Sequence, residues 1–195
     1  MARQMRIIAG RFKGRRLLSP PRGSRSRPIT GRAKESVFDT LGPLLVEACV
    51  VDLYCGTGAM GLEALSRGAR RCYFAEKDAA VVARLRRNIE AMDAGDRSVV
   101  WVGDVTKRLA KWLLVLDCEV DAAFVDPPYA DSRRWHWCQV DKSVFTPLAS
   151  RLGPQAVVVL RTPAGLHVPE KLGRLAARRI KRYGDMAVTM FEQTG

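Results

Sequence analysis

The chain has 195 residues, of which 47% are hydrophobic, and a formal net charge of +13. This length suits one well-buried domain and is short for two. No apolar run approaches the roughly 20 residues that span a bilayer, and no signal-like apolar stretch follows the basic N-terminus. The sequence therefore argues against a membrane protein, and we expect a soluble, cytoplasmic one.

The positive charge is concentrated at the start of the chain. Residues 1–34 contain 11 Lys and Arg residues and no Asp or Glu, whereas the rest of the chain has 22 basic and 20 acidic residues. A second basic cluster near the C-terminus consists of Lys171, Arg174, Arg178, Arg179, Lys181 and Arg182. Such patches attract phosphate backbones through counterion release. We therefore expect a nucleic-acid partner, the alternative being a basic face that is only solvated.

The cysteines form no recognisable ligand or disulfide pattern. Their number is odd and no two follow the spacing C-x-x-C, the positions being Cys49, Cys55, Cys72, Cys118 and Cys138. This pattern predicts reduced, buried thiols and argues against a disulfide framework or a zinc site. With only two histidines in the chain, we expect no metal.

The first third of the chain is predicted to form a hairpin and a helix. Residues 6–10 and 15–18 flank a glycine-containing turn, and a Pro/Ser/Arg/Gly-rich segment follows at 19–28. Thr30 is expected to cap a helix that runs to about residue 48 and is broken or kinked at Gly42-Pro43. We divide the chain into a basic N-terminal extension, residues 1–29, and one domain, residues 30–195.

Strands and helices alternate in the remainder. Apolar strands are predicted at 49–54, 72–75, 99–102, 122–125 and 156–160, and helices at 59–66, 79–92 and 105–115. Strands that are apolar on both faces and separated by helices indicate a parallel sheet covered on both sides. A last pair of strands, 176–183 and 186–192, is predicted as an antiparallel hairpin at the sheet edge. The predicted fold class is a doubly wound, Rossmann-like α/β sheet with strand order 3-2-1-4-5.

A glycine-rich turn follows the first strand. The residues from Gly56 to Gly61 fit the pattern G-x-G-x-x-G, which lets the backbone turn tightly and approach a ligand. Glu76 ends the second strand, 20 positions after Gly56, and is placed to bind ribose hydroxyls. Because NAD and S-adenosylmethionine both contain adenosine, these two features leave both cofactors open.

Two aspartates bear on the choice of cofactor. Asp52 lies just before the glycines, where a carboxylate can receive the ammonium of a methionine moiety but gains nothing from the pyrophosphate of NAD. Asp104 follows the third strand and is placed to accept a hydrogen bond from the adenine amine. The alternative for Asp104 is a helix N-cap. Asp52 favours S-adenosylmethionine.

The fourth strand is followed by Asp126-Pro127-Pro128-Tyr129. Prolines cannot donate to a strand ladder, so the tetrapeptide is expected beyond the carboxyl end of the strand, facing the glycine-rich turn. An exocyclic base amine is a poor nucleophile because its lone pair is delocalised into the ring. The Asp126 carboxylate and the Pro127 carbonyl are expected to accept from this amine and localise the lone pair, and Tyr129 to stack on the base. The alternative is a rigid turn without chemistry.

The tetrapeptide is typical of amino-methyltransferases that act on nucleic-acid bases or on protein glutamine. More broadly, the chain resembles the RsmD family of 16S rRNA guanine-N2 methyltransferases. The resemblance lies in residues 6–10, 14–15, 27–30, 52–69, 76–78 and 126–129, together with Arg32, Glu35 and Phe38. Gly31, Cys55 and Thr57 depart from the usual family residues.

The resemblance implies a site and a substrate. It implies S-adenosylmethionine as cofactor and, as substrate, the N2 amine of a guanine in the RNA of the small ribosomal subunit. Cofactor contacts are expected from Asp52, Tyr54, Gly56, Gly58, Glu76, Lys77 and Asp104. RNA contacts are expected from Arg11, Lys13, Arg15, Arg27, Thr30 and Arg32, and catalytic roles from Asp126, Pro127, Pro128 and Tyr129. We expect a monomer.

Other interpretations remain open. A DNA or protein-glutamine methyltransferase would use the same tetrapeptide, and a catalytically silent RNA-binding module or an NAD enzyme would keep the fold. Trp135 and Trp137 stand beside Arg133 and Arg134, which suits either an RNA-stacking surface or half-buried packing of a lid. His136 is expected to be structural.

Overall fold

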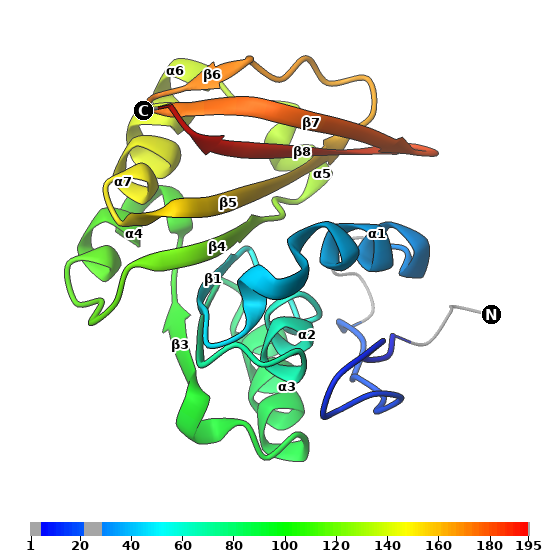
Figure 1. The fold of residues 1–195 in the computed structure, drawn as a ribbon. Helices are drawn as coiled ribbons and strands as arrows, with labels where there is room; N and C mark the ends of the chain where they lie inside the picture. The colour runs from blue at the N-terminus through cyan, green and yellow to red at the C-terminus, as the bar shows by residue number, and fades with distance from the viewer. Residues whose placement is uncertain (1–4, 22–28, 195) are drawn as a thin grey trace.

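A single mixed sheet runs through the molecule (Figure 1). The computed structural model describes residues 5–21 and 29–194. In this part of the chain the strand order is β3-β2-β1-β4-β5-β8-β7-β6. The strands are β1 (Cys49–Leu53), β2 (Arg71–Glu76), β3 (Ser98–Val102), β4 (Val120–Val125), β5 (Leu152–Pro163), β6 (Lys171–Leu172), β7 (Leu175–Tyr183) and β8 (Met186–Gln193).

The strand pairing confirms the predicted topology. Strands β1 to β5 are parallel in the order 3-2-1-4-5, with β1 between β2 and β4. The strands β7 and β8 form the predicted antiparallel hairpin, and β8 pairs antiparallel with β5. The short strand β6 was not predicted and forms the outer edge. Because β1 and β4 are neighbours, the segments that follow Leu53 and Val125 emerge side by side.

Helical segments cover both faces of the sheet. In chain order they are α1 (Gly31–Leu41), η1 (Gly42–Leu45), α2 (Gly61–Ser66), α3 (Ala79–Ala91), η2 (Gly95–Arg97), α4 (Val105–Leu113), α5 (Tyr129–Ser132), α6 (Trp137–Val140), η3 (Asp141–Phe145) and α7 (Thr146–Ala149). Thr30 caps α1 as predicted, its side chain accepting from the Ala33 N–H. The expected break falls at Gly42, where φ is +41° and η1 begins.

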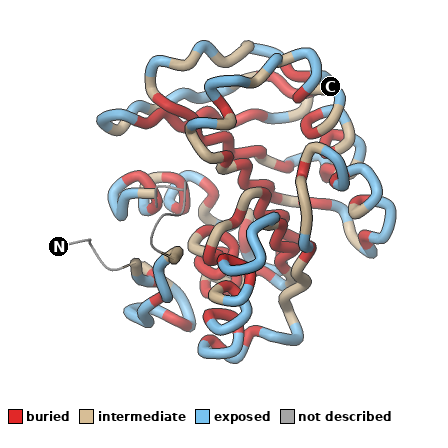
Figure 2. The backbone as a smooth tube through the Cα atoms, turned by 180° about the vertical axis from the view of Figure 1, so that it is seen from behind, coloured by how far each residue is buried: buried red, intermediate tan, exposed pale blue. Residues whose placement is uncertain are grey.

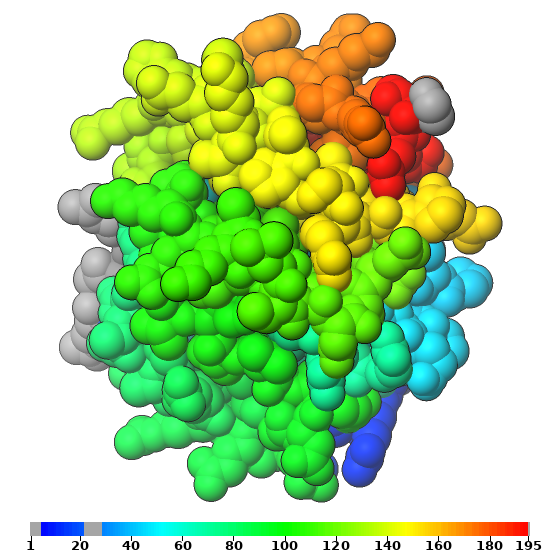
Figure 3. All heavy atoms as spheres, turned by 90° about the vertical axis from the view of Figure 1, so that its left-hand side faces the viewer, coloured from blue at the N-terminus to red at the C-terminus, as the bar shows by residue number. Residues whose placement is uncertain are grey.

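Alternate residues of the strands enter two separate cores. Val50 of β1 belongs to the core under the N-terminal segment and helices α1 to α3, whereas its neighbour Val51 belongs to the core under α4 and α7. Figure 2 shows the central strands as an almost continuous buried layer. The chain from α4 to α7, green to yellow, is seen in Figure 3 on one side of the molecule.

The N-terminal segment, residues 5–21, packs onto the domain. Ile7, Phe12 and Leu17 are each 2% exposed and lie in the core shared with α1, α2 and α3. The predicted hairpin is present as a turn with one isolated antiparallel bridge, between Arg6 and Arg16. The proposed boundary at residue 29 stays a prediction.

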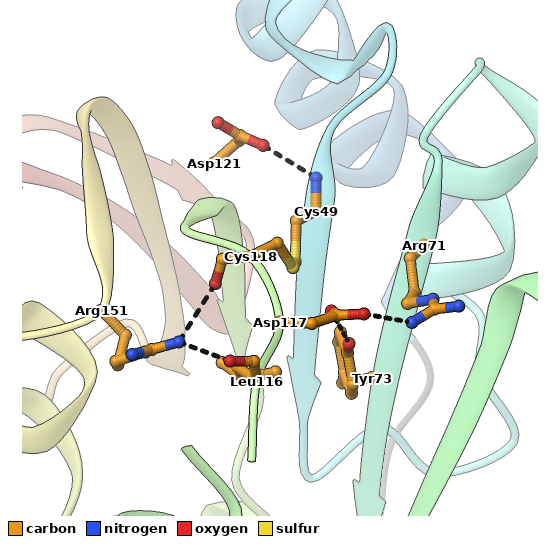
Figure 4. The surroundings of a disulfide bond; sticks show 8 residues. All are labelled: Cys49, Arg71, Tyr73, Leu116, Asp117, Cys118, Asp121 and Arg151. Carbon is orange, nitrogen blue, oxygen red and sulfur yellow. Dashed lines mark hydrogen bonds and ion pairs between the residues drawn. A yellow bond between two sulfur atoms is a disulfide. The ribbon is translucent and has the colours of Figure 1, made fainter. Parts of the chain in front are cut away.

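The expectation that the cysteines are all reduced is wrong for one pair. Cys49 at the start of β1 and Cys118 just before β4 form a disulfide across 69 residues of sequence (Figure 4). The sequence gives no spacing signal for this pair, because the two residues meet only when β4 pairs with β1. Cys55, Cys72 and Cys138 are free; the first two are buried as expected, whereas Cys138 is exposed and the expectation of burial is wrong for it.

Among the helices of residues 5–21 and 29–194, none combines the length and the apolar character that a membrane span requires. Within the same ranges, His, Cys, Asp and Glu side chains form no cluster able to hold a metal ion.

Candidate active site

The glycine-rich turn between β1 and α2 is shaped by left-handed backbone conformations. Tyr54, Gly56 and Gly58 have φ values of +58°, +56° and +87°. The Gly56 N–H donates to Oε2 of Glu76 at 3.1 Å, which fixes the turn against the end of β2. The turn then enters α2 at Gly61, whose N–H donates to Oδ2 of Asp52 at 2.8 Å.

Asp52 is a buried carboxyl group whose two oxygens differ in their hydrogen bonding. It is only 1% exposed, and its Oδ1 atom has no hydrogen-bond partner in the described part of the chain. The pKa of Asp52 is raised to about 8, chiefly by burial; the nearby carboxylates of Asp126 and Glu76 contribute to this rise, and the hydrogen bond from the Gly61 N–H opposes it. A buried acceptor without a partner costs free energy, so this atom is suited to a cationic or hydrogen-bonding ligand.

The two glycines of the turn face different surroundings. A Cβ atom on Gly56 would meet nothing within 4 Å, whereas one on Gly58 would lie 2.5 Å from Cδ1 of Leu85. Gly56 therefore lies beside open space, and Gly58 permits close packing against α3. The sequence pattern does not distinguish these two roles.

The other expected cofactor residues lie at the ends of β2 and β3. Oε1 of Glu76 accepts from the N–H groups of Lys77 and Asp78 at 2.7 and 2.9 Å. The Lys77 ammonium lies 3.2 Å from Asp131. Asp104 is the N-cap of α4, accepting from the Thr106 N–H at 3.0 Å. The alternative role for Asp104 is thus present, and a contact of Asp104 with adenine stays a prediction.

The tetrapeptide lies beyond the end of β4, as expected. The Asp126 N–H still donates to the Leu53 carbonyl of β1, at 3.2 Å. Pro128 is the N-cap of the four-residue helix α5, whose first residue is Tyr129, and its carbonyl accepts from the N–H groups of Asp131 and Ser132 at the other end of that helix. Among the described residues, hydrogen bonds are made to the Pro128 carbonyl but not to the Pro127 carbonyl. The Pro127 carbonyl is the one expected to accept from the base amine.

Arg161 is a site residue that the sequence analysis missed. It is 5% exposed, pairs through Nε with Oδ1 of Asp126, and lies with its guanidinium carbon 5.4 Å from the centre of the Tyr129 ring. Burial raises the pKa of Asp126, and the charge of Arg161 opposes this rise. The available signal was a single charged residue that ends the apolar run 156–160 of a strand next to β4.

One cavity joins the turn after β1 to the tetrapeptide. It is lined by Met5, Pro20, Ile29, Asp52, Tyr54, Cys55, Gly56, Thr57, Ala59, Met60, Asp126 and Arg161. Tyr54 is largely buried there, and burial raises the pKa of its hydroxyl. The structure thus brings Asp52 and Asp126 to one cavity. Met5, Pro20 and Ile29 of the N-terminal part also line it, although the sequence analysis predicted no site role for them. The cavity lining does not include Gly58, Glu76, Lys77 or Asp104.

The tryptophans after the tetrapeptide pack onto the domain. The Trp135 ring centre lies 6.3 Å from that of Tyr54, 5.4 Å from that of Trp137 and 6.5 Å from that of Phe145. Trp135 and Trp137 are both partly buried. Of the two expected roles, half-buried packing is the one the contacts support.

The expected RNA-binding residues lie mainly on the surface. Arg11, Lys13, Arg15, Thr30 and Arg32 are exposed. Arg15 also donates to the Ala91 carbonyl at 2.8 Å. Arg27 lies outside the described residues. RNA contacts of these residues stay predictions.

The fold, the glycine-rich turn and the tetrapeptide together define a Rossmann-like methyltransferase. The chain belongs to the Conserved hypothetical protein 95 family, whose model matches residues 5–192. The resemblance to the RsmD family is confirmed by this match and by the relatives described next.

Two relatives illustrate the similarity in sequence. The Ribosomal RNA small subunit methyltransferase D of Escherichia coli strain K12 is 37% identical over 126 residues, which are 65% of this chain and 61% of that protein. The protein YlbH of Bacillus subtilis strain 168 is 28% identical over 193 residues, 98% of this chain and 100% of that one.

Solved structures share the fold. The structure of yhhF from Escherichia coli has a TM-score of 0.78 at 30% identity and covers 97% of this chain and 98% of its own. An RNA methyltransferase from Salinibacter ruber in complex with S-adenosyl-L-homocysteine has a TM-score of 0.58 at 18% identity, covering 84% and 92%. The second likeness concerns the fold alone.

Proposed function

We propose that this protein transfers a methyl group from S-adenosylmethionine to the exocyclic N2 of a guanine in 16S rRNA. The observation that carries the proposal is the shared cavity of Asp52 and Asp126, at the carboxyl ends of two neighbouring parallel strands. In such sheets, ligands bind where the strand order reverses, which here is between β1 and β4.

The residues present fit S-adenosylmethionine. The unpartnered Oδ1 of Asp52 suits the ammonium of the methionine part, and the open side of Gly56 lets the cofactor lie against the backbone. Tyr54 supplies an apolar wall, and Glu76, Lys77 and Asp104 complete the proposed binding region. Gly58 would serve this region indirectly, by letting the turn pack against Leu85. When bound, S-adenosylmethionine supplies an activated methyl group: a nitrogen–carbon bond forms as the carbon–sulfur bond breaks, leaving S-adenosylhomocysteine and a proton.

The tetrapeptide would prepare the base amine. A carboxylate that accepts from the amine keeps the nitrogen lone pair out of the ring, and it can take the proton that leaves after transfer. The Pro127 carbonyl offers a second acceptor, and the Tyr129 ring a stacking face. Much of the rate would come from holding the amine and the methyl group in line.

The RNA would be held by the exposed basic residues of the N-terminal segment and by the start of α1. Arg11, Lys13, Arg15 and Arg32 are exposed there, and Arg27 and Thr30 belong to the same proposed contact. The Escherichia coli relative is named for the small ribosomal subunit, which supports that subunit as the source of the RNA. A protein-glutamine substrate would not need so basic an extension, and against a DNA substrate the support comes from the relatives named for ribosomal RNA.

Transfer of labelled methyl groups from S-adenosylmethionine tests the proposal. The substrates are unmethylated small subunits, free 16S rRNA, duplex DNA and a release factor as the protein-glutamine substrate, and the labelled nucleotide is then identified by mass spectrometry. We expect N2-methylguanine in the ribosomal RNA and none in DNA or protein. Label in DNA, in protein or in another base would contradict the proposed specificity. A steep fall of RNA affinity with salt is also expected, less steep when Arg11, Lys13 and Arg15 are changed to Gln.

A further inference from the structure

The strand β5 places an arginine beside the tetrapeptide. Leu160 of β5 is in register with Val125 of β4, so Arg161 stands next to Asp126 across the two strand ends. The five apolar residues 156–160 precede Arg161 in its strand, and Arg161 is itself 5% exposed. A buried guanidinium is stable in such a position only when its charge is compensated.

Arg161 contacts both polar members of the tetrapeptide. Its Nε pairs with Oδ1 of Asp126, and its guanidinium carbon lies 5.4 Å from the centre of the Tyr129 ring, within cation–π distance. The ion pair occupies Oδ1 of Asp126. Oδ2 is then the carboxylate oxygen that can accept from a ligand in the cavity. One side chain thereby orients the carboxylate and the ring at once.

We propose that Arg161 is a positioning residue for methyl transfer, which holds the Asp126 carboxylate in an ion pair and fixes the directions of Asp126 and Tyr129. This inference rests on the proposed function, because Asp126 and Tyr129 are taken as the groups that receive the base. Arg161 acts through these two residues and needs no contact with the base or the cofactor.

The electrostatics agree with this role. Burial raises the pKa of Asp126, and Arg161 holds it back through its charge and its hydrogen bond. Among the residues that the structure describes, three other titratable groups line the same cavity, namely Asp52, Tyr54 and Cys55. Of these groups, Asp52 is the one whose titration is coupled to that of Asp126, because the charge of Asp126 raises the pKa of Asp52. Any pH experiment must therefore separate Asp126 from Asp52.

The experiment compares Arg161→Met, Arg161→Lys and the matched control Arg151→Met in single-turnover methyl transfer to small-subunit RNA between pH 5.5 and about 9. Arg151 is a partly buried arginine directly before the start of β5, and its side chain donates to the Leu116 carbonyl at 2.7 Å. We expect Arg161→Met to lower the rate at pH 7 by about tenfold to a hundredfold. The acidic limb of its profile should move to higher pH, with part of the rate recovered there.

The other variants separate charge from folding. Arg161→Lys keeps a positive charge, so the acidic limb of its pH–rate profile should stay near that of the wild type while its rate falls. Arg151→Met should match the wild type in both rate and profile. In an Asp126→Asn background, Arg161→Met should add little further loss, because the partner is already gone. The proposal would be overturned if Arg161→Met lowered the rate by the same factor at every pH and if this factor multiplied with that of Asp126→Asn in the double variant. Wild-type rates in Arg161→Met would overturn it as well. If Arg161→Met does not fold, a shifted limb in Arg161→Lys would overturn it.

A second readout does not depend on activity. The carboxyl carbon-13 NMR signal of Asp126, assigned by its disappearance in Asp126→Asn, should titrate at higher pH in Arg161→Met than in the wild type. An unchanged titration would overturn the inference even if the protein methylates rRNA. A shifted titration in a protein that methylates no RNA would instead leave the ion-pair role standing and contradict the proposed function.

Discussion

The Lys34 ammonium lies 2.7 Å from Oε2 of Glu63, and both side chains are buried. Glu63 also accepts from the N–H groups of Ile8 and Ala9 and pairs with Arg67. One carboxylate of α2 thus holds the N-terminal segment, the first helix and its own helix together. The basic segment proposed to bind RNA is thereby attached to the helix that follows the glycine-rich turn.

Removal of this carboxylate should therefore release the N-terminal segment. We expect Glu63→Ala to lower the free energy of unfolding by about 3–5 kcal/mol, because Lys34 is left buried without its partner. Lys34→Met keeps most of the packing and leaves Glu63 its other donors, so a loss of about 1–3 kcal/mol is expected. Urea denaturation measures both, with the exposed Glu90→Ala as control. Faster trypsin cleavage between residues 11 and 16 should accompany the loss in Glu63→Ala; cleavage at the wild-type rate would contradict this account.

The glycine-rich turn gives a paired test. Gly56→Ala adds a methyl group to open space at a φ of +56°, so we expect a strain of about 1–2 kcal/mol and at least a tenfold loss of cofactor affinity. In Gly58→Ala the methyl group would meet Leu85 at 2.5 Å, so overpacking of about 1–3 kcal/mol adds to the strain at φ +87°. Calorimetry and urea denaturation should show mainly a binding defect in the first variant and mainly a folding defect in the second. The reverse assignment would refute this description of the turn.

The parallel sheet follows from the sequence because its strands are short apolar runs separated by helices, and the strand order follows from the doubly wound fold class that this alternation indicates. The same logic places Asp52 and Asp126 at one edge of the sheet. The partners of these residues could not be predicted in the same way. The pairs Arg161–Asp126 and Cys49–Cys118 are set by register between neighbouring strands, and the sequence carries no period that relates them. The N-terminal segment looked like a charged extension because its arginines outnumber the three apolar residues, Ile7, Phe12 and Leu17, that anchor it.

The pKa of Asp52 predicts a pH-dependent cofactor affinity. Below about pH 8 the buried carboxyl of the free protein is protonated, and an ammonium ligand prefers the ionised form. Affinity for S-adenosylmethionine should therefore rise with pH up to about pH 8, by at most about tenfold per pH unit, with release of a proton on binding. Calorimetry in buffers of different ionisation enthalpy measures both quantities. Asp52→Asn should bind weakly and without this dependence; a flat profile in the wild type would exclude Asp52 as the titrating group.

The same raised pKa has a consequence for stability. A carboxyl whose pKa is higher in the folded than in the unfolded protein stabilises the fold at low pH, and this contribution is lost as the pH rises through about 8. The cofactor-free wild type should thus lose stability between pH 5 and about 8 relative to Asp52→Asn. Thermal unfolding at several pH values makes the comparison, and parallel curves for the two proteins would contradict it.

The chemical step is the last and most direct test of the tetrapeptide. If Asp126 accepts from the base amine, Asp126→Ala removes an interaction that is strongest in the transition state, and kcat should fall by about a hundredfold or more while KM for RNA changes little. This variant also takes the partner from the buried Arg161, so its folding must be checked by thermal unfolding. Asp126→Asn keeps the shape and one acceptor oxygen, and partial activity is expected.

Tyr129→Phe keeps the ring against the base and should be mild, whereas Tyr129→Ala removes it and should be severe. The expected order is wild type, then Tyr129→Phe and Asp126→Asn, then both alanine variants. A folded Asp126→Ala protein that transfers methyl groups at the wild-type rate in single turnovers would reduce the tetrapeptide to a turn, and the base amine would have to be activated elsewhere in the cavity.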